Sequence, residues 1–182
     1  MVQSPASNEL RLVFWESTAG CNLECRHCRR LDVSGEAPGR DLTTGQARDM
    51  IAAIRRAGSP ILVFSGGEPL IRPDIFDLAD FAHAAGLPTA LASNGVLIDA
   101  AMAGRIRDAH IRRVSVSLDG PDEATHNHLR RQRGCFAAAC DALRHLRDAG
   151  VSTQINCTVA RHNVDRLDEL YRLATDLAVD AL

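Results

Sequence analysis

The feature that most limits how this 182-residue chain can fold is a regular alternation of strand-like and helix-like segments. Five short runs are rich in apolar and β-branched residues, as strands are. They span residues 11–17, 61–66, 88–93, 113–119 and 152–159. Segments with apolar residues at helical spacing lie between them. This alternation predicts an α/β fold with a parallel sheet, right-handed crossovers and helices on the outside.

Local signals mark the ends of the expected helices. Thr43 and Gln46 form a capping box, which predicts a helix start, and Gly58 predicts the end of that helix. Pro73 suits the first turn of a second helix, which Gly86 ends. Three further apolar stripes with helical spacing begin at Ile98, Phe136 and Leu167. Such stripes are expected to face the core.

Two of the strands carry one apolar and one polar face, because successive side chains point to opposite sides of a strand. The polar positions are Ser115, Ser117, Asp119, Gln154, Asn156 and Thr158. The apolar faces must lie under the helices. The polar faces would then line the interior of a barrel-like sheet, which favours a bound polar ligand over a packed core.

The chain is too short for a closed eight-fold barrel, which usually needs about 250 residues. Residues 178–182 resemble the opening of a sixth strand with no helix after it. We therefore expect a partial TIM-like barrel, incomplete at its C-terminal end and belonging to a longer protein. Residues 1–10 are expected to form a flexible N-terminal segment, and residues 11–182 one core domain of five βα units plus the start of a sixth strand.

The overall composition excludes some classes of protein. A hydrophobic content of 46% is enough for a buried core, and a net charge of −2 gives no reason to expect a nucleic-acid or membrane-surface partner. No apolar run approaches the roughly 20 residues that span a bilayer, and the N-terminus lacks the pattern of an export signal. Free thiols suit a reducing compartment, so the expected location is the cytoplasm.

Three cysteines, Cys21, Cys25 and Cys28, lie close together in the sequence CNLECRHC. Cysteine sulfur is the usual ligand of iron–sulfur clusters, and three thiolates can hold three irons of a four-iron cluster. The fourth iron would then be open to a small molecule. Metal sites that perform chemistry keep a position open, whereas structural sites are closed. The spacing therefore predicts a reactive cluster.

Zinc binding and chance are the alternatives to a cluster. Cys25 and Cys28 form one zinc-like pair, but no second pair follows, and His27 would have to turn back on the segment to reach a metal. A disulfide framework does not suit this composition. The other cysteines are interpreted as buried structural thiols: Cys135, Cys140 and Cys157.

The segment CNLECRHC resembles the CxxxCxxC signature of radical S-adenosylmethionine (SAM) enzymes, whose core is a partial (β/α)6 barrel. The resemblance runs from about residue 11 to the end of the chain, and four further motifs follow the cysteines in the family's order. They are SGGEP (65–69), SNG (93–95), SLDG (117–120) and THNHLRRQRGCF (125–136), the last of which is similar to a THDxxRGxxGSF stretch. Together these motifs are far more specific than any one of them.

The resemblance implies that Cys21, Cys25 and Cys28 are the metal-binding and catalytic residues, holding a [4Fe–4S] cluster to which SAM binds. The implied cofactor-binding residues are Gly66, Gly67, Glu68, Ser93, Asn94, Ser117, Asp119, Arg130 and Asn156. Of these, the GGEP motif is implied to contact the methionyl amino group, SLDG the ribose, and Arg130 the SAM carboxylate. The cysteine loop, Gly66–Gly67, Ser93–Asn94, Ser117–Asp119 and Asn156 fall at or near the carboxyl ends of the expected strands, where ligands of parallel α/β sheets gather.

Two positions depart from the family pattern. Arg131 stands where a glycine is common, and His27 replaces an aromatic residue, although its planar ring could still pack against the adenine. Neither change affects the cluster ligands.

The implied reaction is reductive cleavage of SAM to a 5′-deoxyadenosyl radical, which abstracts a hydrogen atom from a substrate. It requires an external one-electron reductant, such as a ferredoxin or flavodoxin. The resemblance extends to enzymes of haem and haem d1 biosynthesis, which implies a tetrapyrrole, and to the SPASM-containing group, which implies a peptide. A non-catalytic metal-binding or electron-transfer module is a third reading. Arginines near the cysteines could bind the carboxylates of a substrate or an acidic reductant: Arg26, Arg29, Arg30, Arg130, Arg131 and Arg133.

Overall fold

The computed structural model describes residues 10–28 and 41–182. It contains one parallel sheet with the strand order β1-β2-β3-β4-β5, which is also the order in the sequence. The strands are β1 (Leu12–Thr18), β2 (Ile61–Gly66), β3 (Thr89–Ser93), β4 (Ile111–Ser117) and β5 (Ser152–Asn156). The predicted α/β class with a parallel, partly closed sheet is confirmed. Nine of the ten residues of the predicted N-terminal segment lie outside the described residues.

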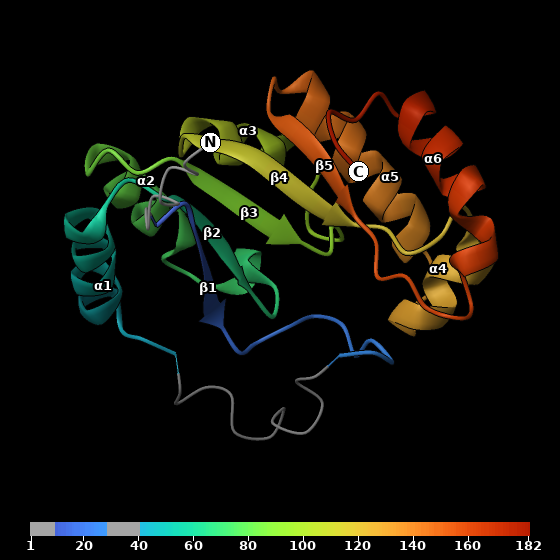
Figure 1. Ribbon diagram of the computed structural model, residues 1–182, viewed down its shortest axis with the longest axis horizontal. Helices are drawn as coiled ribbons and strands as arrows, with labels where there is room; N and C mark the ends of the chain where they lie inside the picture. The colour runs from blue at the N-terminus through green and yellow to red at the C-terminus, as the bar shows by residue number, and fades with distance from the viewer. Residues whose placement is uncertain (1–9, 29–40) are drawn as a thin grey trace, which may run out of the picture.

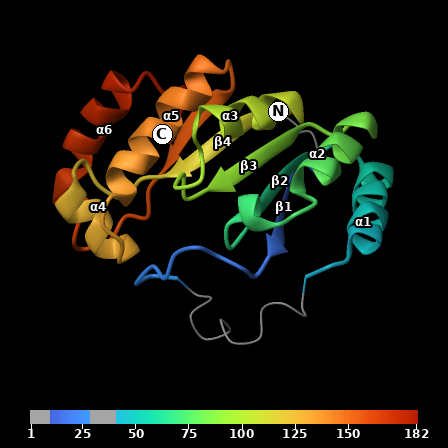
Figure 2. The ribbon, with the colours of Figure 1, turned by 180° about the vertical axis from the view of Figure 1, so that it is seen from behind.

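Helices connect the strands and cover the outer face of the curved sheet (Figures 1 and 2). They are α1 (Thr44–Ala57), α2 (Ile75–Ala84), α3 (Ala100–Asp108), α4 (Glu123–Arg130), α5 (Cys135–Asp148) and α6 (Leu167–Asp176). Two short 3-10 helices, η3 (Pro69–Ile71) and η4 (Val164–Arg166), precede α2 and α6. The core lies between the sheet and these helices and includes Leu62, Phe64 and Leu91, all with no exposed surface.

The predicted helix ends are largely confirmed. The Thr43 hydroxyl accepts a hydrogen bond from the Gln46 backbone N–H, while the Gln46 side chain accepts one from the Thr43 N–H. Gly58 caps the end of α1, as predicted. Pro73 does not lie in the first turn of α2, because that helix begins two residues later, after its N-cap at Asp74.

Two helices differ from the expectation. Ile98 is buried but precedes α3, whose N-cap is Asp99; the Asp99 carboxylate accepts a hydrogen bond from Met102 N. Helix α4 was not predicted as a separate element. Its polar sequence contains one apolar residue that packs inward, Leu129, so its apolar stripe is too weak to be recognised.

The expected faces of β4 and β5 are confirmed within the strands. Val114 and Val116 are fully buried under the helices, whereas Ser115 and Ser117 are half-buried on the other side. The expectation for Asp119 is wrong: β4 ends at Ser117, and Asp119 is fully buried beyond it. A carboxylate can be buried there because backbone and side-chain donors surround it.

The last residues of the chain run beside β5. Ala181 forms a parallel bridge with Gln154, and the Ile155 N–H donates to Ala181 O at 2.9 Å. The Asp180 carboxylate accepts hydrogen bonds from the Ser152 hydroxyl and the Thr153 N–H, which anchors this segment at the sheet edge. Among the helices described, none is long and apolar enough to span a membrane.

Candidate functional site

The segment that carries the three cysteines leaves the sheet at the end of β1 and extends towards α4 (Figure 1, blue). The loop after β2 holds its beginning, because the Gly67 N–H donates to Thr18 O at 2.8 Å and the Glu68 N–H donates to Gly20 O at 2.9 Å. Its far part is held by the end of α4, where the Arg26 N–H donates to Leu129 O at 2.8 Å. Backbone hydrogen bonds at both ends therefore fix the segment across the carboxyl ends of the strands.

A cavity of about 430 Å³ opens between this segment and the strand ends. It is lined by Cys21, Leu23, Cys25, His27, Cys28, Ser65, Gly66, Gly67, Ala92, Ser93, Asn94, Ser117, Arg130 and Thr158. All the site residues proposed from the sequence are in this lining except Glu68, Asp119 and Asn156. Thr158, two residues beyond the end of β5, lines the cavity where Asn156 was expected.

The three candidate ligand thiols share one apolar setting. Cys25 is buried, and Cys21 and Cys28 are half-buried. Leu23, Cys25 and Cys135 form a small apolar cluster, and Cys21 and Cys28 pack against it. Burial raises the pKa of the Cys25 thiol, and the nearby Arg130 guanidinium opposes that increase.

This donor set fits an iron–sulfur cluster, because three cysteines, whose sulfur is a soft ligand, line one cavity and no other cysteine lines it. The ligands of a four-iron cluster each bind a different iron, so they need not converge on a single point. Among the described residues, no three His, Cys, Asp or Glu side chains are arranged to hold one metal ion.

The interpretation of the other cysteines needs one correction. Cys135 and Cys140 are buried, as expected, but Cys157 is only half-buried. It lies at the end of β5, where its sulfur accepts a contact from the Asn163 amide at 3.7 Å.

Glu68 supports the wall of the cavity from behind. Its carboxylate is fully buried and accepts hydrogen bonds from Asn94 N (2.8 Å), Ser93 Oγ (2.9 Å) and Leu70 N (3.3 Å). Burial raises its pKa, and these three donors counteract the effect. The carboxylate thus joins the loop after β2 to the end of β3, and so fixes two lining residues, Ser93 and Asn94.

Asn94 connects β3 to the cysteine segment. Its amide nitrogen donates to the Asn22 side-chain oxygen at 2.7 Å and lies 4.0 Å from the Cys21 sulfur. Its amide oxygen accepts from Val96 N at 2.9 Å. Asn22 was not predicted as a site residue. It lies between two cysteines of the signature, and no sequence pattern there indicates its hydrogen bond with Asn94.

A buried ion pair lies on the other side of the cavity. Arg130 donates through Nε (2.8 Å) and Nη2 (2.7 Å) to Oδ2 of Asp119. Its remaining nitrogen, Nη1, lies 3.6 Å from the Cys25 sulfur. The other carboxylate oxygen of Asp119 accepts from the Thr158 N–H at 2.9 Å. Arg130 therefore places positive charge beside one candidate ligand, and Asp119 acts by orienting Arg130.

His126 completes this network. Its Nδ1 accepts a hydrogen bond from the Asp119 N–H at 3.0 Å, and its ring packs against Phe136. Burial lowers the pKa of His126 to about 4, and the charge of Arg130 adds to the decrease. The imidazole is therefore neutral at pH 7, as its acceptor role requires.

Gly66 has a structural requirement of its own. Its φ of +116° lies in a region that L-residues rarely adopt, and a Cβ there would lie 2.5 Å from Thr18 O. Only glycine lets β2 end this close to β1. Arg131, where the family pattern has glycine, has a φ of +58° and forms the left-handed end of α4.

The described members of the basic group differ in exposure. Arg130 is buried in its ion pair, whereas Arg26, Arg131 and Arg133 are exposed. Arg29 and Arg30 lie outside the described residues.

A parallel partial barrel with a three-cysteine cavity at its strand ends defines a class of cluster-binding α/β protein. The sequence profile of the radical SAM superfamily matches residues 15–174, and the chain belongs to this superfamily. The superfamily uses a [4Fe–4S] cluster and SAM (AdoMet) as cofactors, and the donor set described above fits them.

Among curated relatives, the AdoMet-dependent heme synthase of Methanosarcina barkeri is 41% identical over 96% of this chain and 50% of its own length. The pre-heme d1 synthase of Dinoroseobacter shibae is 35% identical over 93% of this chain and 41% of its own. The mycofactocin maturase MftC of Mycobacterium ulcerans is 38% identical over 88% and 43%. The chain thus spans about half the length of the curated relatives it matches, or less.

Solved structures show the same fold. The structure of anSMEcpe with bound AdoMet has a TM-score of 0.78 and 23% identity, and the match covers 96% of this chain and 50% of that one. Methylornithine synthase has a TM-score of 0.75 and 16% identity, over 97% of this chain and 54% of that one. At these identities the likeness concerns the fold alone.

Proposed function

We propose that this chain is the catalytic core of a radical SAM enzyme, with Cys21, Cys25 and Cys28 as the three protein ligands of a [4Fe–4S] cluster. The observation that carries the proposal is that three cysteines line one cavity at the strand ends. When bound, the cluster and SAM supply one-electron cleavage of the SAM sulfonium, which yields an oxidant able to abstract hydrogen from a C–H bond.

The remaining residues of the site bind and orient the cofactor and shield it from water. Gly66 and Gly67 line the cavity with backbone, where a ligand's amino group could donate to carbonyl oxygens. Ser93, Asn94 and Ser117 offer polar groups on the same wall. Glu68, Asp119 and Asn156 lie behind or beside this wall, and we propose that Glu68 and Asp119 act by holding the lining residues in place. The apolar contacts of Leu23 exclude water beside Cys25.

For the substrate we propose a tetrapyrrole that carries carboxylates. Support comes from the relatives named as heme and heme d1 synthases. Further support comes from two exposed arginines that adjoin cavity-lining residues and can bind carboxylates, Arg26 and Arg131. A peptide is the second candidate, favoured by the likeness to MftC and to a structure solved with a peptide bound. We also propose a ferredoxin or flavodoxin as the reductant and the cytoplasm as the location, since both suit an oxygen-sensitive cluster.

The test is anaerobic reconstitution of the full chain with iron and sulfide, followed by an assay for 5′-deoxyadenosine with SAM and dithionite. The wild type is expected to take up on the order of four irons per chain and to form 5′-deoxyadenosine. Cys25→Ala should do neither. Cys135→Ala is the matched control, because Cys135 is also buried and packs against Cys25 but does not line the cavity.

Three results would count against the proposal. One zinc per chain in place of iron would favour a structural metal site. A cluster without 5′-deoxyadenosine would favour an electron-transfer module. Equal iron loss in Cys25→Ala and Cys135→Ala would contradict the assignment of Cys25 as a cluster ligand. Turnover of a carboxylated tetrapyrrole, but not of a peptide, by the full-length protein would separate the two substrate proposals.

A further inference from the structure

Arg72 is a buried arginine that takes no part in lining the cluster cavity. It follows η3, three residues after the end of the GGEP motif, and its side chain is only 5% exposed. Burying a guanidinium is costly unless its charge and its donors are satisfied. Its partners therefore indicate what it does in this fold.

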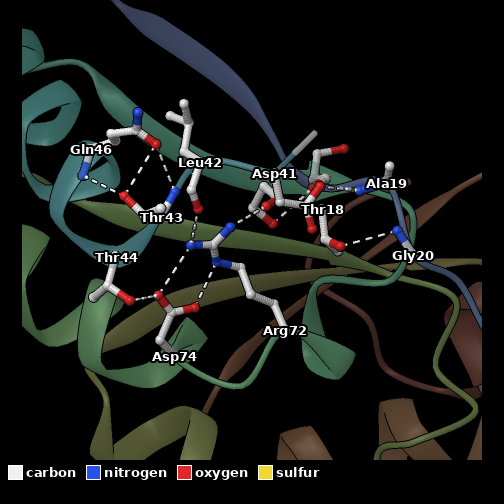
Figure 3. Close-up of polar contacts among 12 residues, drawn as sticks. Thr18, Ala19, Gly20, Asp41, Leu42, Thr43, Thr44, Gln46, Arg72 and Asp74 are labelled. Atoms are coloured by element: carbon white, nitrogen blue, oxygen red, sulfur yellow. Dashed lines mark hydrogen bonds and ion pairs between the residues drawn. The ribbon is translucent and has the colours of Figure 1, made fainter. Parts of the chain in front are cut away.

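Two of these partners are backbone carbonyls on either side of the cysteine segment (Figure 3). Nη1 donates to Ser17 O at 2.7 Å, and Nη2 donates to Leu42 O at 2.9 Å. Ser17 lies near the end of β1, just before the cysteines, and Leu42 lies just before α1, after them. One guanidinium thus joins a chain position before the three candidate ligands to a chain position after them.

Asp74 balances the charge of Arg72 and fixes its orientation. Its Oδ1 lies 2.7 Å from Nε, and its Oδ2 accepts from Nη2 at 3.0 Å. Although Asp74 is the N-cap residue of α2, its side chain makes no capping hydrogen bond. Instead it accepts a second bond from the Thr44 hydroxyl at 2.6 Å, at the start of α1 (Figure 3). The carboxylate is therefore committed to this bridge rather than to its own helix.

Two further contacts strengthen the bridge. The guanidinium carbon lies 5.3 Å from the ring centroid of Trp15 in β1, a cation–π distance. The Asp41 carboxylate accepts from the Ala19 N–H at 2.8 Å, which joins the same two ends directly (Figure 3). A planar fork of donors is needed to reach both carbonyls and Asp74 at once, and lysine has no such fork.

We propose that Arg72 is a positioning residue for the cluster: it fastens Ser17, before the first candidate ligand, to Leu42, after the last, and so helps to keep the three thiolates at the spacing that retains iron. The inference rests on the proposed function, because it presupposes a cluster on these cysteines. It concerns how firmly the site is held and assigns Arg72 no contact with the reacting atoms.

The test measures how fast the reconstituted cluster is lost to an excess of iron chelator, followed by the decay of its visible absorption. Outer contacts of metal sites typically change affinity 10–100-fold, so Arg72→Met should lose its cluster at least about tenfold faster than the wild type. Arg72→Lys keeps the charge but not the fork and should fall in between. Arg105→Met is the matched control, since Arg105 also stacks on an aromatic ring, Phe76, but is exposed.

Lower stability alone could also speed cluster loss, and Leu146→Ala tests for this. Leu146 is fully buried in α5, which contacts β4 and β5, whereas Arg72 holds β1 to the start of α1. Leu146→Ala should lower the thermal midpoint and yet lose its cluster at nearly the wild-type rate. The inference is overturned if folded Arg72→Met retains its cluster as long as the wild type does, or if Leu146→Ala releases iron as fast as Arg72→Met.

If Arg72→Met fails to fold, judged by far-ultraviolet circular dichroism, the comparison is made with Arg72→Lys, which must still lose iron faster than Arg105→Met. Failure of the wild type to take up any cluster would instead contradict the proposed function itself. The two failures are therefore distinguishable.

Discussion

Glu68 is a carboxylate whose buried oxygens face N–H and O–H donors of its own chain. In Glu68→Gln, an NH₂ group would replace one acceptor and meet a donor such as Asn94 N–H. An unsatisfied buried donor costs about 1–3 kcal/mol, so the free energy of unfolding should fall by that amount. Urea denaturation measures it. Glu24→Gln, at an exposed glutamate in the cysteine segment, should change the value by less than about 0.5 kcal/mol.

His126 makes the stability of the chain depend on pH. Its folded pKa, about 4, lies below its ordinary value of 6.5, so the unfolded chain binds the proton more readily. The contribution to stability is complete above pH 6.5 and is lost as pH falls towards 4, by about 3 kcal/mol in total. His126→Asn keeps an acceptor for the Asp119 N–H but does not titrate. The unfolding free energies of the two proteins, measured by denaturation at each pH, should converge as pH falls. A difference that stays constant with pH would contradict this role.

At the scale of elements, the end of α4 shows what one departure from the family pattern costs in stability. Arg131 adopts φ +58° there, a conformation that costs an L-residue about 1 kcal/mol relative to glycine. Arg131→Gly should therefore raise the free energy of unfolding by up to about 1 kcal/mol. Arg131→Ala removes the same side chain but keeps the Cβ, so it should give no gain. Equal effects in both variants would show that the arginine side chain, and not the backbone, matters.

The elements also show how far the sequence could predict this structure. Strand β2 and the capping box of α1 were predicted because their signals are local: an apolar run bounded by Gly66, and two side chains three residues apart. Asp119 was misplaced because a strand's polar alternation does not reveal where the strand ends. The bridge made by Arg72 could not be predicted, since its partners, Ser17 and Leu42, are backbone carbonyls distant in sequence. The roles proposed for the site residues remain predictions.

On the scale of the whole molecule, the helices cover one face of an open sheet (Figure 1). The neighbouring strands β1 and β2 each present a phenylalanine, but Phe64 has no exposed surface and Phe14 is 64% exposed. Phe64→Ala should cost about 3–5 kcal/mol of unfolding free energy because it leaves a cavity in the core. Phe14→Ala should cost less than about 0.5 kcal/mol in this chain. Similar losses in both variants would contradict the one-sided packing.

The same open arrangement leaves the cysteine segment at the carboxyl edge of the sheet, held by the loop after β2, by α4 and by Arg72. The chain spans about half the length of the AdoMet-dependent heme synthase that it matches. What the described residues do define is a cavity lined by three cysteines. We propose that these cysteines bind three irons of the cluster and leave the fourth exposed.

The most direct test of that open iron is the electron paramagnetic resonance spectrum of the reduced, reconstituted cluster before and after SAM is added. Binding of SAM to the fourth iron predicts a clear change in the g-values. No such change is expected with 5′-deoxyadenosine, which lacks the methionine part of SAM. A spectrum that SAM leaves unchanged, in protein that carries its full complement of iron, would contradict the assignment of this site.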